Sequence, residues 1–238
     1  MRCILENELI PYEESSIPDG PYLIFAPHPD DETFGMGGTI AKAVHQGIDV
    51  HVVVLTDGGK GGDVIIRKKE ASAAAELLGI KQMFFCELTD RSLFSARLPE
   101  KMLYEILDCV HPACIFLPSL QEFHPDHRGA TQGISRWLTT CNYKGLIWLY
   151  EITRQGEVNR LVDISSFIDQ KKSAVRCYHS QLSQLEYENV ILAINKARSL
   201  TLPPHVNYAE GFWEVSRITK LSIDKTYMDH LGLYKIKE

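Results

Sequence analysis

The feature that most constrains the fold is an alternation of short apolar runs with helical patterns. Residues 50–55 read Val-His-Val-Val-Val-Leu, a near-continuous β-branched run. Such a run is typical of a strand buried on both faces of a parallel sheet. Further strands are predicted at 22–26, 83–86, 114–117 and 146–150, and helices at 37–46, 64–78, 100–110 and 128–138.

This order predicts an α/β protein. Strands that are joined by crossover helices run parallel, and the helices cover both faces of the sheet. We therefore expect a Rossmann-like, mostly parallel sheet with helices on both faces. After about residue 163 the pattern turns helical, at 169–179 and 188–200, which predicts a helical C-terminal region.

Length and charge bound the possible functions. The chain has 238 residues, of which 45% are hydrophobic and 24% charged, and no linker or repeat interrupts it. This composition is ordinary for one globular unit, so we expect a single domain over 1–238. The net charge of −6 argues against a nucleic-acid partner, because binding to phosphate backbones needs a basic surface.

Three observations predict a cytoplasmic protein. No apolar run approaches the roughly 20 residues that span a bilayer, so no membrane span is expected. Glu6 and Glu8 interrupt any signal-peptide core near the start of the chain. The six cysteines are scattered without a Cys-x-x-Cys pair, which predicts reduced thiols rather than a disulfide scaffold or a structural zinc knuckle.

Polar side chains gather where predicted strands end. The segment 27–32, Pro-His-Pro-Asp-Asp-Glu, follows the first strand, and 123–127, Phe-His-Pro-Asp-His, comes after the fourth. The carboxyl ends of parallel strands share one edge of the sheet, where ligands bind. In a Rossmann-like strand order the first and fourth strands are neighbours. Both segments would then flank one crevice.

Other charged residues are expected near the same edge. The glycine-rich segment 58–62 after the second strand carries Lys60, which is available to an anionic part of a substrate. Asp90 and Arg91 follow the third strand. Arg67 lies four residues before Ala71, on the inward stripe of the predicted helix 64–78, so we expect it to point inward.

His28, Asp31 and His127 form a candidate metal-ligand set. Two imidazoles and one carboxylate leave coordination positions open, which is typical of a catalytic metal site. Zn²⁺ suits this set, and Fe²⁺ can use the same ligands. A His-x-x-Asp pair by itself is commonly just a surface turn. Two such segments at matching ends of one sheet favour the metal.

Neighbouring groups indicate the reaction. Asp30 would lie beside the metal and could serve as the general base for a metal-bound water. His124, oriented by Asp126, could carry a positive charge, stabilise an oxyanion and protonate a leaving amine. Together these groups fit the hydrolysis of an amide.

These segments resemble the PIG-L/LmbE-like zinc-dependent de-N-acetylases. The resemblance covers about residues 20–215, and the combination of His-Pro-Asp-Asp-Glu with His-Pro-Asp-His is its most specific part. It implies a core domain over that range, one Zn²⁺ per subunit and a homo-oligomer. The implied roles are zinc ligation by His28, Asp31 and His127, base catalysis by Asp30, oxyanion stabilisation by His124 with its partner Asp126, and substrate contacts by Arg67 and Asp90.

Two positions depart from the family pattern. The usual Asp-Gly after the third strand is Asp90-Arg91 here, which places a large cation at the rim of the site. Tyr178 stands where many relatives carry histidine, and we assign it no catalytic role.

The expected function is that of a metal-dependent hydrolase. It would remove the N-acetyl group from an N-acetylglucosamine-type amino-sugar conjugate, with zinc-bound water attacking the amide. Two alternatives stay open on the sequence: an Fe(II)-dependent oxygenase that uses the same His/Asp/His set, and a non-catalytic sugar-binding module on the same fold. Oxygen-dependent turnover would identify the first, and binding without acetate release the second.

Overall fold

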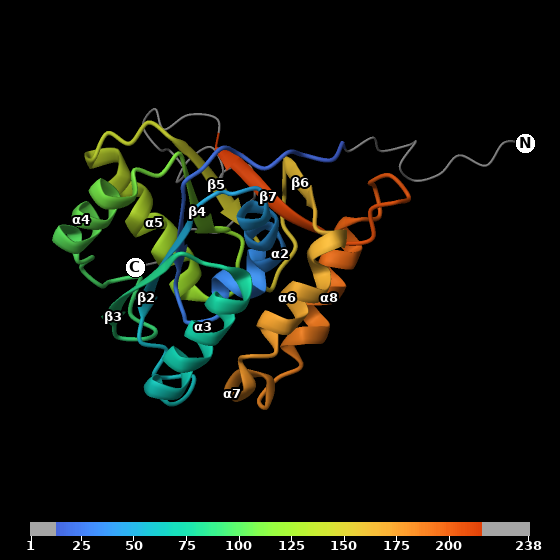
Figure 1. Ribbon diagram of the computed structural model, residues 1–238. Helices are drawn as coiled ribbons and strands as arrows, with labels where there is room; N and C mark the ends of the chain where they lie inside the picture. Colours follow the sequence, from blue (N-terminus) through green and yellow to red (C-terminus); the bar gives the residue numbers. More distant parts are fainter. Residues whose placement is uncertain (1–12, 216–238) are drawn as a thin grey trace, which may run out of the picture.

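The computed structural model describes residues 13–215, which form a seven-stranded sheet covered by helices (Figure 1). The strand order is β3-β2-β1-β4-β5-β7-β6. The strands are β1 (Tyr22–Ala26), β2 (Val50–Thr56), β3 (Gln82–Leu88), β4 (Cys114–Pro118), β5 (Leu146–Tyr150), β6 (Arg160–Asp163) and β7 (Ala209–Val215). The helices are α2 (Asp31–His45), α3 (Val64–Leu78), α4 (Glu100–Val110), α5 (Pro125–Thr140), α6 (Ile168–Val175), α7 (His179–Leu182) and α8 (Tyr187–Arg198), with a 3₁₀ turn, η1 (Ser165–Phe167), before α6.

The first five strands form a parallel sheet in a Rossmann-like order, as predicted. β1 pairs in parallel with β2 on one side and with β4 on the other. β1, β2 and β4 are buried along their whole length. The adjacency of β1 and β4 confirms the neighbours expected from the sequence, so the segments that follow these two strands leave the sheet side by side.

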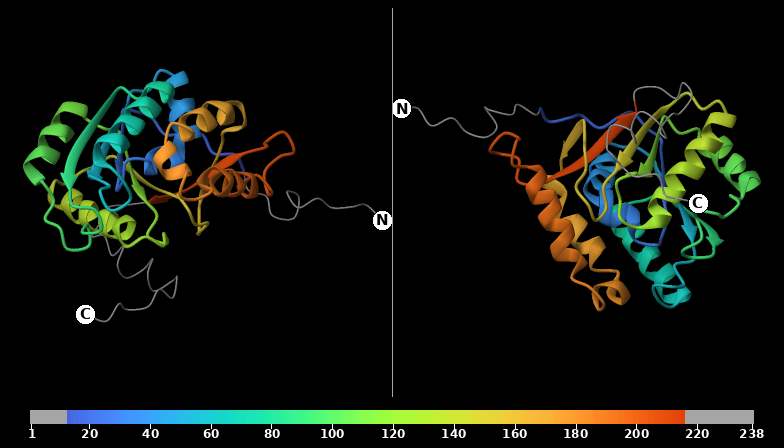
Figure 2. Two further views of the ribbon diagram at one scale, coloured as in Figure 1. Left: turned by 90° about the horizontal axis from the view of Figure 1, so that it is seen from below. Right: turned by 180° about the vertical axis from the view of Figure 1, so that it is seen from behind.

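Helices cover both faces of the sheet (Figure 2). One core lies between the sheet and α2, α3 and α6, with Ile40, Ala74 and Ala174 among its buried residues. A second core lies between the sheet and α4 and α5, around Ile106 and Ile134. The left view of Figure 2 shows the blue, teal and orange helices on one side of the sheet and the green ones on the other.

The C-terminal region differs in part from its prediction. α6, α7 and α8 confirm its helical character, but β6 and β7 were not predicted. β7 pairs antiparallel with both β5 and β6 and extends the sheet beyond β5. Phe212 of β7 is fully buried and packs against Trp148 and Phe116. This long-range packing stabilises the strand.

Helix α2 begins earlier than predicted and is broken inside. It starts at Asp31 rather than at residue 37, and Met36 has non-helical dihedral angles (φ −139°). The predicted helix corresponds to the half after this break. There the backbone N–H groups of Gly38 and Thr39 donate hydrogen bonds to the Glu210 carboxylate at 2.9 and 2.7 Å. Glu210 therefore caps the second half of α2 from β7.

A buried lysine balances that carboxylate. Lys171 Nζ on α6 donates to Glu210 Oε1 at 2.7 Å and to Asn195 Oδ1 at 2.9 Å, and the side chains of Lys171 and Glu210 are inaccessible to solvent. Burial lowers the pKa of Lys171, and Glu210 opposes that shift. The pair links α2, α6 and β7 at one point.

The structure tests only part of the sequence observations behind the predicted cytoplasmic location. No helix between residues 13 and 215 combines the length and the apolar composition that crossing a bilayer requires. The five cysteines of this range are free thiols. Cys3 and the start of the chain, on which the signal-peptide argument depends, lie outside the described residues.

We predict that Lys171→Met destabilises the fold by about 3–5 kcal/mol, because it leaves the Glu210 charge buried without its partner. Chemical denaturation followed by circular dichroism measures the change. Lys144→Met, at an exposed lysine, is the control and should change the free energy of unfolding by no more than about 0.5 kcal/mol. Equal stability of the two variants would contradict the proposed link.

Candidate active site

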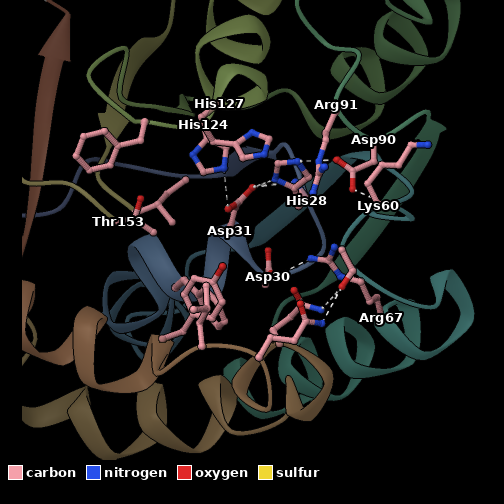
Figure 3. A pocket seen from close by; sticks show the side chains of 18 of the residues that line it. His28, Asp30, Asp31, Lys60, Arg67, Asp90, Arg91, His124, His127 and Thr153 are labelled. Carbon is pink, nitrogen blue, oxygen red and sulfur yellow. Dashed lines mark hydrogen bonds and ion pairs between the residues drawn. The ribbon is translucent and has the colours of Figure 1, made fainter.

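The site lies at the carboxyl edge of β1 and β4. β1 leads into the turn that carries His28 and Asp30, and α2 starts at Asp31. After β4 the chain reaches His124, which precedes α5, and His127 lies in the first turn of that helix. Because β1 and β4 are parallel neighbours, both segments open into one cavity of about 570 Å³ (Figure 3). This volume is typical of a small-molecule site.

The three predicted metal ligands are brought together. His28 Nδ1 lies 3.0 Å from Asp31 Oδ2, and His127 Nε2 lies 3.2 Å from Asp31 Oδ1. The centroids of the two imidazole rings are 5.3 Å apart, and all three residues are buried. The backbone N–H of His28 also donates to Asp31 Oδ2 at 2.8 Å, which fixes this carboxylate within its turn.

The outer nitrogens of both imidazoles face further carboxylates. His28 Nε2 lies 3.3 Å from Asp90 Oδ1 and 3.4 Å from Asp126 Oδ2. His127 Nδ1 lies 3.7 Å from Glu122 Oε2. Metal-ligating histidines usually direct their second ring nitrogen at a carboxylate, which selects the tautomer and orients the ring. This arrangement leaves His28 Nδ1 and His127 Nε2 to face the ligand position.

The charges around His28 and His127 favour a cation between them. Burial by itself would lower the pKa of His28, but Asp31, Asp126 and Asp90 together raise it well above its usual value. Burial opposes the charge on His127 as well, yet Asp31 and Glu122 raise its pKa to about 9. The protein thus favours positive charge between these carboxylates. Two imidazoles and a carboxylate around such a position fit a divalent ion such as Zn²⁺.

A second possible donor group includes His124. One ligand atom each from His28, His124 and His127 lies within 4.8 Å of the others, so His124 stands close enough to the expected ion to act beside it. His28, Asp90 and Asp126 form another such group within residues 13–215. The sequence placed only His28, Asp31 and His127 at the metal.

Asp30 is held by Arg67. Arg67 Nη2 donates to Asp30 Oδ2 at 2.8 Å, and its Nη1 donates to the Gly58 carbonyl at 2.8 Å. Gly58 has φ +65°, and a Cβ there would lie 2.6 Å from Arg67 Nη1, so the turn needs glycine. Burial raises the pKa of Asp30, although Arg67 opposes this shift. Arg67 is buried as expected, and its guanidinium contacts the candidate base.

His124 has a defined tautomer. Its Nδ1 accepts a hydrogen bond from the backbone N–H of Asp126 at 3.1 Å, so a neutral ring carries its proton on Nε2. Burial lowers the pKa of His124, and the nearby His28 and His127 lower it further. On the sequence alone, His124 could carry a positive charge. The structure instead favours a neutral imidazole with a free N–H donor.

Asp126 and Asp90 both face His28, and both also accept hydrogen bonds from backbone N–H groups of neighbouring loops. Asp126 accepts hydrogen bonds from the backbone N–H groups of Arg91 at 2.6 Å and Leu93 at 3.0 Å. Its carboxylate was expected to orient His124, but their hydrogen bond uses the Asp126 backbone. Asp90 lines the cavity and accepts from the backbone N–H of Lys60 at 2.9 Å.

Sequence reasoning missed two buried acids. Glu122 accepts hydrogen bonds from the Ile152 N–H at 2.7 Å and the Thr153 hydroxyl at 2.9 Å, besides facing His127. The one feature of the sequence that points to Glu122 is its position two residues before His124. Glu32, the last residue of the His-Pro-Asp-Asp-Glu segment, accepts from the Tyr178 hydroxyl at 2.9 Å, and burial raises its pKa to about 7. Tyr178 therefore makes a buried contact with the residue that follows Asp31.

Fold and site together define a Rossmann-like protein with a candidate metal centre at the switch between β1 and β4. Residues 23–138 match the PIG-L family, described as GlcNAc-PI de-N-acetylase. Diacetylchitobiose deacetylase of Thermococcus kodakarensis is 32% identical over 191 residues, which cover 70% of this chain and 72% of that protein. The chain belongs to the PIG-L/LmbE family.

Other similar proteins include further deacetylases and a hydratase. A probable N-acetyl-alpha-D-glucosaminyl L-malate deacetylase 2 of Bacillus cereus is 30% identical, covering 67% of this chain and 82% of that protein. The solved N,N'-diacetylchitobiose deacetylase of Pyrococcus horikoshii superposes with a TM-score of 0.69 at 28% identity, over 85% and 87% of the two chains. A 4-oxalmesaconate hydratase of Pseudomonas putida is 24% identical over 85% of this chain and 92% of its own length. The reaction must therefore be argued from the site.

We predict that Zn²⁺ stabilises the folded chain. At free metal about 1,000 times its dissociation constant the gain is about 4 kcal/mol, or on the order of 10 °C in melting temperature. Thermal melts of chelator-treated protein with and without Zn²⁺ measure it. His127→Ala should abolish the shift, whereas His205→Ala, at an exposed histidine outside the cavity, should preserve it. A shift that survives His127→Ala would place the ion elsewhere.

Proposed function

We propose that this protein is a zinc-dependent N-deacetylase that hydrolyses the acetamide of an N-acetylglucosamine-type conjugate. The observation that supports it best is the placement of a buried carboxylate, Asp30, beside the convergent set His28, Asp31 and His127. A pure sugar-binding module has no need of a carboxylate with a raised pKa at that position. Membership of a family that includes amino-sugar deacetylases supports the same reaction class.

The metal ion and the side chains beside it would have separate roles in the reaction. Zn²⁺ held by His28, Asp31 and His127 would polarise the acetyl carbonyl and acidify a bound water. Asp30 takes the proton of the attacking water. Because Arg67 occupies Asp30 Oδ2, the other oxygen is the one available for this transfer. The raised pKa of Asp30 brings it nearer to the working pH, which favours general base catalysis.

His124 stabilises the charge that develops on the acetyl oxygen. The neutral ring donates from Nε2, since Nδ1 is occupied by the Asp126 N–H. A fixed donor of this kind needs no reorganisation during the reaction. When the carbon–nitrogen bond breaks, the proton held by Asp30 passes to the amine nitrogen and acetate leaves. Cytoplasmic location and a homo-oligomeric state stay predictions from the sequence.

We predict that Asp30→Asn lowers kcat by about 10²- to 10⁴-fold, the usual contribution of a general base, and keeps the metal. Acetate release from N,N'-diacetylchitobiose and metal content per chain measure the two effects. Asp108→Asn, at an exposed position outside the cavity, is the matched control. Near-wild-type turnover by Asp30→Asn would refute the mechanism. Turnover that requires oxygen would indicate the oxygenase instead.

A second prediction concerns His124. His124→Ala should lower kcat by about 10²- to 10³-fold with little change in KM, because the donor acts on charge that forms in the transition state. Steady-state kinetics on the same substrate separate the two constants. Metal content should stay at the wild-type level, since His28, Asp31 and His127 are intact. A variant that lost its metal would identify His124 as a ligand.

A further inference from the structure

Two cations of the cavity have no partner among the residues that the structure describes. Lys60 and Arg91 both line it and are both exposed. Within residues 13–215 neither charged head group makes a hydrogen bond or an ion pair, whereas Arg67 in the same cavity donates to Asp30 and to the Gly58 carbonyl. Figure 3 shows Lys60 and Arg91 on either side of Asp90, on the side of the site away from Thr153. Two unpaired cations therefore flank one wall of the pocket.

The backbones beneath these cations are fixed to the candidate metal centre. The Lys60 N–H donates to Asp90 at 2.9 Å, and the Arg91 N–H donates to Asp126 at 2.6 Å. Both carboxylates also lie within 3.4 Å of His28 Nε2. The loops after β2 and β3 are thus fixed in position relative to the candidate metal ligands. The charged head groups of Lys60 and Arg91 stay available to a bound molecule.

Arg91 occupies an unfavourable backbone conformation. Its φ is +61°, in the left-handed region that glycine adopts without steric cost and other residues avoid. Nothing in its own side-chain contacts offsets this cost within the described residues. A long cation kept at such a position beside a binding cavity points to a role in recognition.

The carboxylates near Lys60 and Arg91 disfavour an anion on this wall. Asp90 lines the cavity, and Asp126 lies 3.4 Å from His28, which also lines it. An anionic molecule would be repelled unless cations screened that wall, and like charges close together are strongly unfavourable in a partly desolvated site. Lys60 and Arg91 are placed to supply this screening next to Asp90.

We propose that Lys60 and Arg91 bind an anionic group, a phosphate or a carboxylate, on the part of the substrate that lies beyond the acetamido sugar. The inference rests on the proposed deacetylase function and narrows its substrate class. Anionic conjugates of N-acetylglucosamine are then preferred to neutral disaccharides. The guanidinium of Arg91 can bind either anion through two N–H groups, and Lys60 adds a point charge.

The test compares three substrates in acetate-release assays on the zinc-loaded protein. They are N-acetylglucosamine 1-phosphate, N-acetylglucosaminyl malate and the neutral N,N'-diacetylchitobiose. Selectivity is the ratio of kcat/KM for each anionic substrate to that for the neutral one. Arg91→Gly and Lys60→Gln are the test variants, and Arg91→Gly suits the left-handed backbone, so it should fold. Lys101→Gln, at a largely exposed lysine outside this cavity, has the same charge change as Lys60→Gln.

The wild type should prefer at least one anionic substrate. Each test variant should lower that selectivity about threefold, and the double variant about tenfold, as for partly exposed ion pairs. The loss should appear in KM and shrink at high salt, while Lys101→Gln keeps the wild-type ratio. Preference for the phosphate or for the malate identifies the anion. Acetate release with equal selectivity in all variants would overturn this inference and leave the deacetylase intact. Absence of acetate release from every substrate would overturn both.

Discussion

The Asp31 carboxylate between His28 and His127 is the contact on which the rest of the site depends. One oxygen faces each imidazole, and the outer nitrogens of both rings face further carboxylates, Asp126 and Glu122 among them. Each ring therefore has a carboxylate at both of its nitrogens. A buried cluster of this kind is stable only with added positive charge. Protonated imidazoles provide it in part, and a divalent ion at the open position would provide it fully.

The fold is arranged to hold that contact in place. Parallel pairing of β1 with β4 brings the two histidine segments to one edge. The break in α2 at Met36 then lets the short turn bearing Asp31 take a direction different from that of the longer half, which Glu210 caps from β7. Lys171 neutralises Glu210 from α6. The C-terminal segment therefore supports the site through α2, although the residues it contributes to the cavity wall, from Gln181 to Tyr187, are uncharged.

The parts of this architecture that depend on local sequence patterns can be predicted from the sequence, and the parts that depend on long-range contacts cannot. Strand and helix periodicity and the rules for crossover connections favour a Rossmann-like strand order. In that order β1 and β4 are neighbours, which brings His28 and His127 to one crevice. The early start of α2 is hidden, because a Pro-Asp-Asp turn looks the same whether or not a helix follows. β7 depends on packing with Trp148 of β5, far away in the chain. Glu122 and the orientation of Asp126 depend on contacts between loops, which no local pattern encodes.

The fold by itself does not determine the reaction, which depends on contacts of individual side chains in the site. A hydratase and deacetylases are all similar to this chain, so the fold is compatible with more than one chemistry. Amide hydrolysis has a particular demand: one group must accept a proton from water and return it to a poor leaving amine. In the proposed reaction Asp30 would meet this demand, because Arg67 fixes one of its oxygens while burial raises its pKa. His124 would stabilise the charge that develops on the acetyl oxygen, since its Nδ1 is already occupied and only Nε2 can donate. These two local contacts, rather than the sheet or the ligand set, support the proposed deacetylation.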